Sequence, residues 1–237
     1  MDQSIAGFTL EAPRSFVRDW VQTVLWPGLA CGGLAVATVS NSLGSEDWIF
    51  IFILGTPVIY WFIVGLLQGR VLRSLIERPR VWAVSTWGGG SLALIGGFGT
   101  FGWLTVWLDE VGAMGFEPDH PLALALFAFC GVVAGLILGF LQAVTMRATW
   151  GERGYWLAWS IGAGSLAFAV LWVGINALAI MADQAHLDFP DTRFFIAIAA
   201  FLLAGALVHS VVTGVALRRL LARRAQRRKE AVVRQFD

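Results

Sequence analysis

Residues 65–93 read GLLQGRVLRSLIERPRVWAVSTWGGGSLA, and residues 139–167 read GFLQAVTMRATWGERGYWLAWSIGAGSLA. The two stretches align without a gap at an offset of seventy-four positions, and ten of the twenty-nine aligned residues are identical. The identical pairs include Gln68 with Gln142, Arg73 with Arg147, and Trp82 with Trp156. Similarity at a fixed offset indicates a repeated structural unit.

Long apolar runs dominate the chain on both sides of this repeat. Of the 237 residues, 57 % are hydrophobic and 14 % are charged, whereas about a quarter are charged in a typical soluble domain. Mean hydropathy is +0.71. About 20 helical residues cross the hydrocarbon core of a bilayer, and six apolar runs reach that length. They cover about 21–43, 48–70, 81–107, 122–146, 155–181 and 194–216. The sequence therefore predicts an all-α integral membrane protein with six transmembrane helices.

The repeat continues in a weaker form toward both ends of the chain. Residues 213–218 resemble 68–73, and residues 32–35 resemble 90–93. We therefore expect three parallel-repeat helical hairpins, inserted in the same sense, about a pseudo-threefold axis along the membrane normal. Inverted repeats, in contrast, are typical of many transporters. The bounds of the hairpins and of the basic tail are about 13–73, 80–147, 154–217 and 218–237.

Positive charges lie in alternate loops. Sixteen of the seventeen Lys and Arg residues precede the first predicted helix, lie in the second or fourth loop, or follow the sixth helix. Only Arg193 lies in the opposite loops, which are acidic. Because basic loops stay on the cytoplasmic side, we expect both termini in the cytoplasm. The membrane would be a bacterial inner membrane or an equivalent internal membrane.

Small residues recur every fourth position within several predicted helices. Gly131, Gly135 and Gly139 keep this spacing, which lets two helix backbones approach closely in lipid. The spacing predicts tight helix packing. The alternative is a groove that holds a flat lipid, a carotenoid or a quinone.

Twelve tryptophans fall into two predicted groups. Those near helix ends are expected to anchor the helices in the membrane interface; they are Trp20, Trp48, Trp61, Trp82, Trp107, Trp150 and Trp156. Those deeper in the spans are expected to fill the core, or to stack on a bound polyene; they are Trp26, Trp87, Trp103, Trp159 and Trp172.

Three polar residues inside the predicted spans are candidate binding residues. Gln68 and Gln142 each lie near the basic end of an even-numbered helix, where an amide can form an inter-helix hydrogen bond worth about 0.6–2 kcal/mol. They can also form a polar ring that contacts a head group or substrate, with Thr213 in the third place. His209 is the only histidine within a span. It can hydrogen-bond Ser210, Thr213 or a neighbouring helix, or ligate a haem or a chlorophyll-type pigment.

Arginines at the basic ends of the helices are candidate contacts for anionic head groups or for a partner protein. They are Arg73, Arg147, Arg218, Arg219, Arg223 and Arg227. The last three share one helical face, which predicts that the sixth helix continues into the tail. Each basic residue near an anionic surface contributes about 1 kcal/mol. Nucleic acid is not expected as a partner, because no aromatic residues are interleaved with the arginines of the tail.

The spans have no Asp, Glu, Lys or Arg well inside them. Intramembrane ionisable residues mark proton relays and ion paths, so this composition argues against a pump or a proton-coupled transporter. No catalytic residue is predicted, because no serine lies in a Gly-x-Ser-x-Gly motif and no base accompanies the serines.

The segments around Gln68, Arg73 and Trp82, and around Gln142, Arg147 and Trp156, resemble a broad group of uncharacterised bacterial multi-pass membrane proteins. That group carries repeated Gly-x-x-Gln-Trp-x-x-Leu-Arg segments, and Gly69 and Ala143 stand here in place of the tryptophan. The likeness covers about residues 60–170. It implies a membrane location and no particular activity.

These observations support three hypotheses from different classes. The first is a non-catalytic scaffold or accessory subunit of a larger inner-membrane complex, with lipid or an apolar pigment between its hairpins. The second is a carrier or channel for a neutral or lipid-like solute. The third is a lipid-modifying enzyme that uses His209 and the two glutamines.

Overall fold

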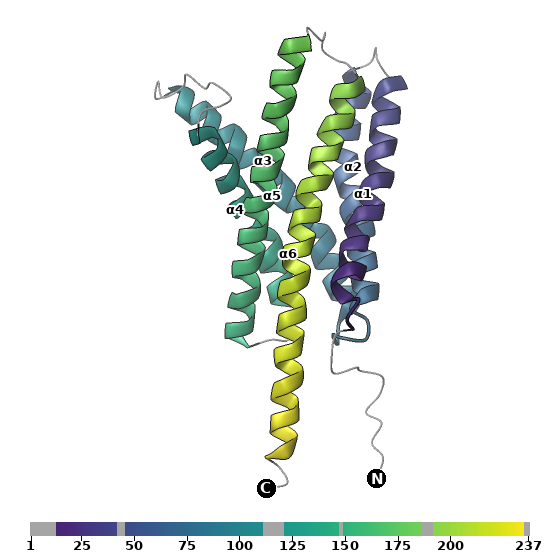
Figure 1. Ribbon diagram of the computed structural model, residues 1–237, viewed down its shortest axis with the longest axis vertical. Helices are drawn as coiled ribbons and strands as arrows, with labels where there is room; N and C mark the ends of the chain where they lie inside the picture. Colours follow the sequence, from purple (N-terminus) through teal and green to yellow (C-terminus); the bar gives the residue numbers. More distant parts are fainter. Residues whose placement is uncertain (1–12, 42–45, 111–120, 147–148, 186–191, 235–237) are drawn as a thin grey trace.

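The computed structural model describes residues 13–41, 46–110, 121–146, 149–185 and 192–234. In this part of the chain the fold is all-helical, with six α-helices and no strand (Figure 1). The helices are α1 (Phe16–Asn41), α2 (Glu46–Val71), α3 (Pro79–Glu110), α4 (Pro121–Thr145), α5 (Trp150–Ala185) and α6 (Thr192–Val233).

The helices have the length and composition of transmembrane segments. Among the described residues, α1 and α3 to α6 each contain at least 23 residues that are apolar enough to cross a bilayer. Helix α2 is continuous over 26 residues. Several such helices in one chain indicate a multi-pass membrane protein. Helix α6 continues to Val233, as the spacing of the tail arginines predicted.

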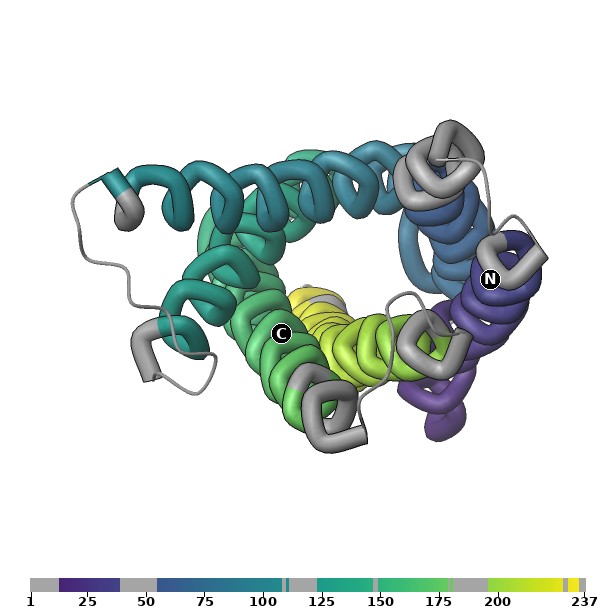
Figure 2. Tube along the Cα trace, turned by 90° about the horizontal axis from the view of Figure 1, so that it is seen from above, coloured from purple at the N-terminus to yellow at the C-terminus, as the bar shows by residue number. Residues whose placement is uncertain are grey.

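The six helices form a closed ring. Consecutive helices pack against each other, and α1 also packs against α6, so each described helix has two neighbours. Figure 2 shows this ring from above. Odd-numbered helices begin, and even-numbered helices end, at the lower side of Figure 1. We call this side the basic end, because Arg14, Arg73 and Arg153 lie at or next to these ends of α1, α2 and α5.

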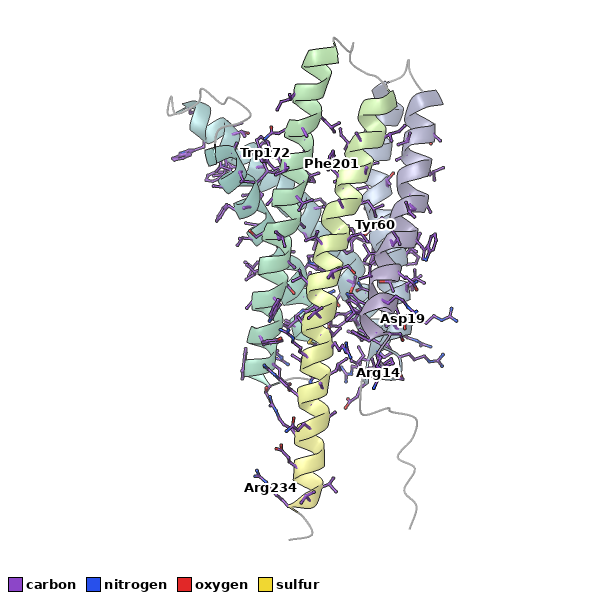
Figure 3. All side chains as sticks on the ribbon, viewed as in Figure 1. Arg14, Asp19, Tyr60, Trp172, Phe201 and Arg234 are labelled. Atoms are coloured by element: carbon purple, nitrogen blue, oxygen red, sulfur yellow. The ribbon has the colours of Figure 1, made fainter. Side chains whose placement is uncertain are left out.

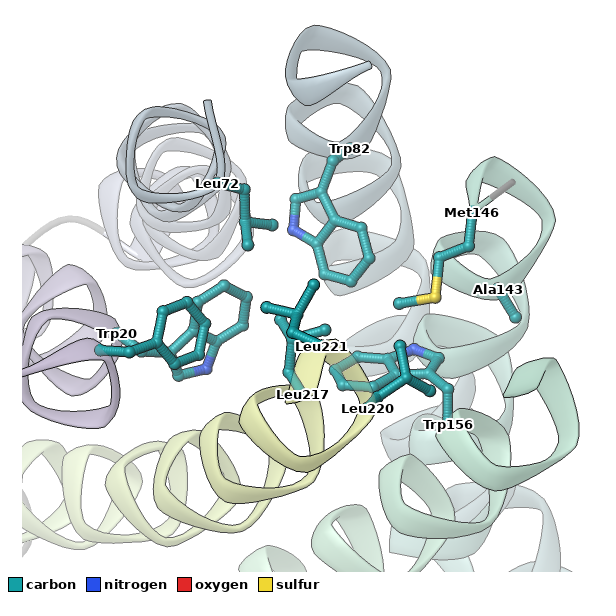
Figure 4. Packing of buried hydrophobic residues seen from close by; sticks show 10 residues of the cluster. Trp20, Leu72, Trp82, Ala143, Met146, Trp156, Leu217, Leu220 and Leu221 are labelled. Atoms are coloured by element: carbon teal, nitrogen blue, oxygen red, sulfur yellow. The ribbon is translucent and has the colours of Figure 1, made fainter. Parts of the chain in front are cut away.

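Two clusters of buried side chains hold the ring together. The first, the basic-end cluster, draws on the basic ends of α1 to α5 and on the middle part of α6 (Figure 4). Its members are Phe16, Trp20, Leu72, Trp82, Ala143, Met146, Trp156, Leu217, Leu220 and Leu221. The second lies between α3, α4 and α5, and comprises Ala93, Phe127, Cys130, Ala134, Leu138 and Phe168.

The predicted close packing of glycines is confirmed where α4 crosses α5. A Cβ atom on Gly131 would overlap the backbone of Gly164, and one on Gly135 would overlap the backbone of Ser160. At Gly139, a Cβ atom would lie 2.5 Å from Cβ of Ser160. Only glycine therefore fits along this face of α4 at the observed separation.

The prediction for the tryptophans was wrong for several members of each group, although Trp172 packs against the second cluster as expected. Trp20, Trp82 and Trp156 are not interface anchors, because each is only 1 % exposed in the basic-end cluster. Conversely, Trp26 and Trp103, expected in the core, are 62 % and 65 % exposed. Position along a helix sets the depth of a side chain in the membrane but not the face on which it lies. In a span that is apolar on every face, hydropathy does not distinguish lipid-facing from helix-facing residues.

Candidate functional site

Three indole rings meet inside the basic-end cluster. The rings of Trp20 and Trp82 lie 6.2 Å apart between centroids, and those of Trp82 and Trp156 lie 5.5 Å apart. Both pairs are edge-to-face, the geometry that the charge distribution of aromatic rings favours. Figure 4 shows the three rings with the leucines of α6 between them. These ring contacts join the starts of α1, α3 and α5 at the basic end.

Gln68 and Gln142 are buried and linked through one hydroxyl group. Oε1 of Gln68 accepts hydrogen bonds from Nε1 of Trp82 at 3.4 Å and from Oγ1 of Thr86 at 3.5 Å. Nε2 of Gln142 donates to the same Thr86 hydroxyl at 2.9 Å. The network therefore ties α2, α3 and α4 together, as expected for the inter-helix bond. Thr86 was not singled out in the sequence, although its partner at the repeat offset, Ser160, also carries a hydroxyl.

Thr213 occupies the matching place on α6. Its Oγ1 accepts a hydrogen bond from Nε1 of Trp20 at 3.4 Å and donates to the carbonyl of His209 at 2.8 Å. The contact joins α6 to α1, the two helices at opposite ends of the sequence. Thr213 thus accepts a hydrogen bond from a tryptophan as Gln68 does. Gln142 bonds Thr86 instead, and Nε1 of Trp156 has no hydrogen-bond partner among the described residues.

His209 shares no hydrogen bond with either glutamine among the described residues. Its Nε2 atom is buried and has no hydrogen-bond partner among the described residues. The described residues also contain no group of three His, Cys, Asp or Glu side chains placed to hold a metal ion. The backbone carbonyl of His209 accepts a hydrogen bond from the Thr213 hydroxyl, and Nε2 of the ring takes no part in it.

Four arginines of α6 face the start of α5, and we call them the arginine face: Arg219, Arg223, Arg224 and Arg227. Because α5 and α6 run in opposite directions, arginines further along α6 contact residues nearer the start of α5. We call this series of contacts the ladder. The Arg219 guanidinium lies 5.9 Å from the ring centre of Trp159, and that of Arg223 lies 4.9 Å from the ring centre of Tyr155. These distances are typical of cation–π contacts.

Glu152 ends the ladder at the first turn of α5. Its carboxylate lies 3.2 Å from Arg224 and 3.7 Å from Arg227. It also caps its own helix, accepting from the backbone N–H of Thr149 at 3.2 Å while its own N–H donates to the Thr149 hydroxyl at 3.3 Å. This is the capping box, a Thr-x-x-Glu pattern that is visible in the sequence. Glu152 was nevertheless missed as a site residue.

The other predicted arginines lie apart from this ladder. Arg73 and Arg218 are exposed, and Arg147 lies outside the described residues. Figure 3 shows Arg14 at the start of the described chain and Arg234 beyond the end of α6, both toward the basic end. Arg219, Arg223 and Arg227, predicted to contact head groups or a partner, are in contact with α5.

No protein-family model matches the chain, and neither does any curated protein or solved structure. The fold and the site therefore define only a class. The chain is an all-helical, multi-pass membrane protein whose ring of helices is joined at one end by buried indoles, amides and hydroxyls.

Proposed function

We propose that the protein is a non-catalytic scaffold or accessory subunit of a larger membrane complex. One observation carries the proposal: the basic end of the ring is filled by close-packed apolar side chains. Every member of the basic-end cluster is at most 7 % exposed. Apolar side chains at a constriction exclude water and close a path for ions or polar solutes, and indole, leucine and methionine side chains occupy this end of the ring.

The buried polar groups at this end support a structural role. The amides of Gln68 and Gln142, and the hydroxyl of Thr213, are engaged with neighbouring helices. Buried hydrogen bonds between helices favour one packing arrangement, although Nε1 of Trp156 and Oγ of Ser160 have no partner among the described residues. A subunit that organises others benefits from such a rigid end.

The proposed architecture is a pseudo-threefold arrangement of like-oriented repeats. Its support is the equivalent position of Leu72, Met146 and Leu217, which are related by the offsets of the repeat and all lie in the basic-end cluster. The same kind of contact joins an even-numbered helix to the next odd-numbered helix around the ring. Trp82 of α3 donates to Gln68 of α2, and Trp20 of α1 donates to Thr213 of α6. In this proposal each such contact joins one hairpin to the next, and the Thr213–Trp20 contact joins the third hairpin back to the first.

The proposed location is a bacterial inner membrane with both termini in the cytoplasm. Support comes from the distribution of arginine along the sequence. The outward surface of the ring is suited to lipids, apolar pigments or other membrane subunits. Large apolar side chains cover it on α3, where Ile95 is 63 % and Trp103 is 65 % exposed.

Native purification in mild detergent tests the scaffold proposal. We expect the tagged protein to co-purify with other membrane subunits in a fixed ratio, and to move no solute when reconstituted alone in liposomes. The carrier hypothesis requires the basic-end cluster to open. A solitary protein that transports a neutral solute, with a rate that changes in Trp82→Ala, would overturn the scaffold proposal in favour of the carrier.

A further inference from the structure

A cleft opens between the arginine face and the start of α5. Its volume is about 150 Å³, several times the roughly 30 Å³ that one water molecule occupies in the liquid. Its lining includes Thr149, Gly151, Glu152, Tyr155, Arg223 and Arg227. The cleft therefore brings two guanidinium groups and a phenol to one small space.

Internal contacts leave this cleft positively charged. Arg223 is held by the ring of Tyr155 rather than by a carboxylate. A cation–π contact uses the face of the guanidinium and leaves its N–H donors free for an anion. Arg224 and Arg227 share the single carboxylate of Glu152. Among these described groups, three positive charges meet one negative charge.

Two further features indicate the kind of anion. The Tyr155 hydroxyl is buried and has no hydrogen-bond partner among the described residues, so it is available as a donor. The side chain of Arg227 is 57 % exposed and lies 3.7 Å from Glu152, a contact loose enough to be shared. Arginine forks and a hydroxyl together match the several oxygens of a phosphate group.

The depth of the cleft matches the head-group region. Trp150, the first residue of α5, is 85 % exposed, with Arg153 above its ring at 5.5 Å. Tryptophan and arginine gather where a helix leaves the hydrocarbon. Tyr155 lies five residues further along α5, about one and a half helical turns away.

We infer that this cleft binds the phosphate of an anionic phospholipid. Arg223 and Arg227 bind the phosphate oxygens, and Tyr155 donates its hydroxyl hydrogen to one of them. Glu152 holds Arg224 and partly opposes the anion, which tunes its affinity. The inference depends on the membrane location of the chain and not on the scaffold role.

Lipid binding to the purified full-length protein tests this inference directly. Native mass spectrometry in mild detergent would compare added phosphatidylglycerol with phosphatidylcholine. We expect the wild-type protein to retain more phosphatidylglycerol. The double variant Arg223→Ala/Arg227→Ala should bind it roughly thirtyfold more weakly, because each basic residue contributes about 1 kcal/mol. Arg218→Ala removes an exposed charge from the same helix outside the cleft, and should change the affinity by no more than about fivefold.

Two milder variants keep the test decisive if the double variant does not fold. Tyr155→Phe preserves the ring beneath Arg223 and should weaken binding about tenfold, the effect of losing a hydrogen bond to a charged group. Glu152→Gln should strengthen binding, because it removes the one opposing charge. Weaker binding in a Glu152→Gln protein of unchanged helix content, or equal losses in Arg218→Ala and the double variant, would overturn the inference.

Competition distinguishes the two sources of phosphate. Millimolar inorganic phosphate should not displace phosphatidylglycerol if the lipid is the ligand, because its acyl chains add affinity from the bilayer. Displacement by inorganic phosphate, or tight binding of an acidic peptide to the same residues, would contradict the lipid assignment. These measurements need no partner subunit. A negative result would therefore overturn the lipid-binding inference but not the scaffold proposal, which the co-purification experiment tests.

Discussion

The indole rings of Trp82 and Trp156 contact each other edge-to-face at 5.5 Å, although seventy-four residues separate them in the sequence. They occupy the same place in the two aligned copies of the repeat. A side chain from one copy therefore packs against its own counterpart from the next. Trp20 extends this contact to a third ring, at 6.2 Å from Trp82.

Replacing the central indole should destabilise the protein strongly. Trp82→Ala removes a side chain that is 1 % exposed and contacts both other rings, so we expect a loss of about 3–5 kcal/mol in the free energy of unfolding. Unfolding of the purified protein by added denaturing detergent, followed by helix content, measures it. Trp103→Ala is the matched control, because Trp103 is 65 % exposed. Equal effects of the two variants would contradict the central position of Trp82.

The crossing of α4 and α5 should not tolerate a methyl group. In Gly135→Ala, the new Cβ would press on the backbone of Ser160, which cannot rotate away, and we expect a loss of at least roughly 1–3 kcal/mol. Gly162→Ala is the control, because nothing lies within 4 Å of a Cβ at that position. It should leave stability unchanged or raise it by up to about 1 kcal/mol. The same unfolding measurement applies, and a stable Gly135→Ala protein would show that the helices lie further apart.

The hydrogen bond between Gln142 and Thr86 should appear as a coupling energy. A double-mutant cycle with Gln142→Leu and Thr86→Val isolates the 2.9 Å contact from the other effects of each change. We expect a coupling of about 0.6–2 kcal/mol, the range of inter-helix hydrogen bonds in membranes. Strictly additive losses in the cycle would mean that the two side chains do not interact.

The ion pairs of Glu152 should fasten the lower part of α6 to α5. Glu152→Gln weakens the contacts to Arg224 and Arg227 and should cost about 1–3 kcal/mol, chiefly through Arg224, whose side chain is 22 % exposed. Amide hydrogen exchange in α6 beyond Leu217 should become faster. Asp19→Asn is the control, because its partner Arg18 is 73 % exposed, and it should cost less than about 1 kcal/mol. Unchanged exchange in Glu152→Gln would contradict the anchoring role.

Local signals in the sequence predicted the helices well. Pro121 has no backbone N–H to lose at the first turn of α4, and glycines four residues apart marked the α4 face that meets α5. Both signals act within one helix, so no knowledge of the neighbours is needed. The same holds for the arginines of α6, whose spacing predicted a continuing helix.

The candidate site could be predicted only in part, because it depends on which helices are neighbours. The repeat identified Gln68 and Gln142, but Thr86 gains its role only when α3 lies between α2 and α4. Trp20 looked like an interface anchor because its partner Thr213 is 193 residues away. The packing of α1 against α6, which closes the ring, is a tertiary contact that no local sequence pattern predicts.

Labelling of single cysteines from either side of the membrane tests the central claim most directly. The claim is that the helix pairs are inserted in the same sense, so that the basic ends share one compartment. In a Cys31→Ser/Cys130→Ser background, a membrane-impermeant thiol reagent should label Arg14→Cys, Arg73→Cys and Arg218→Cys from one side, and Glu110→Cys from the other. Labelling of Arg73→Cys and Arg218→Cys from opposite sides would contradict the account.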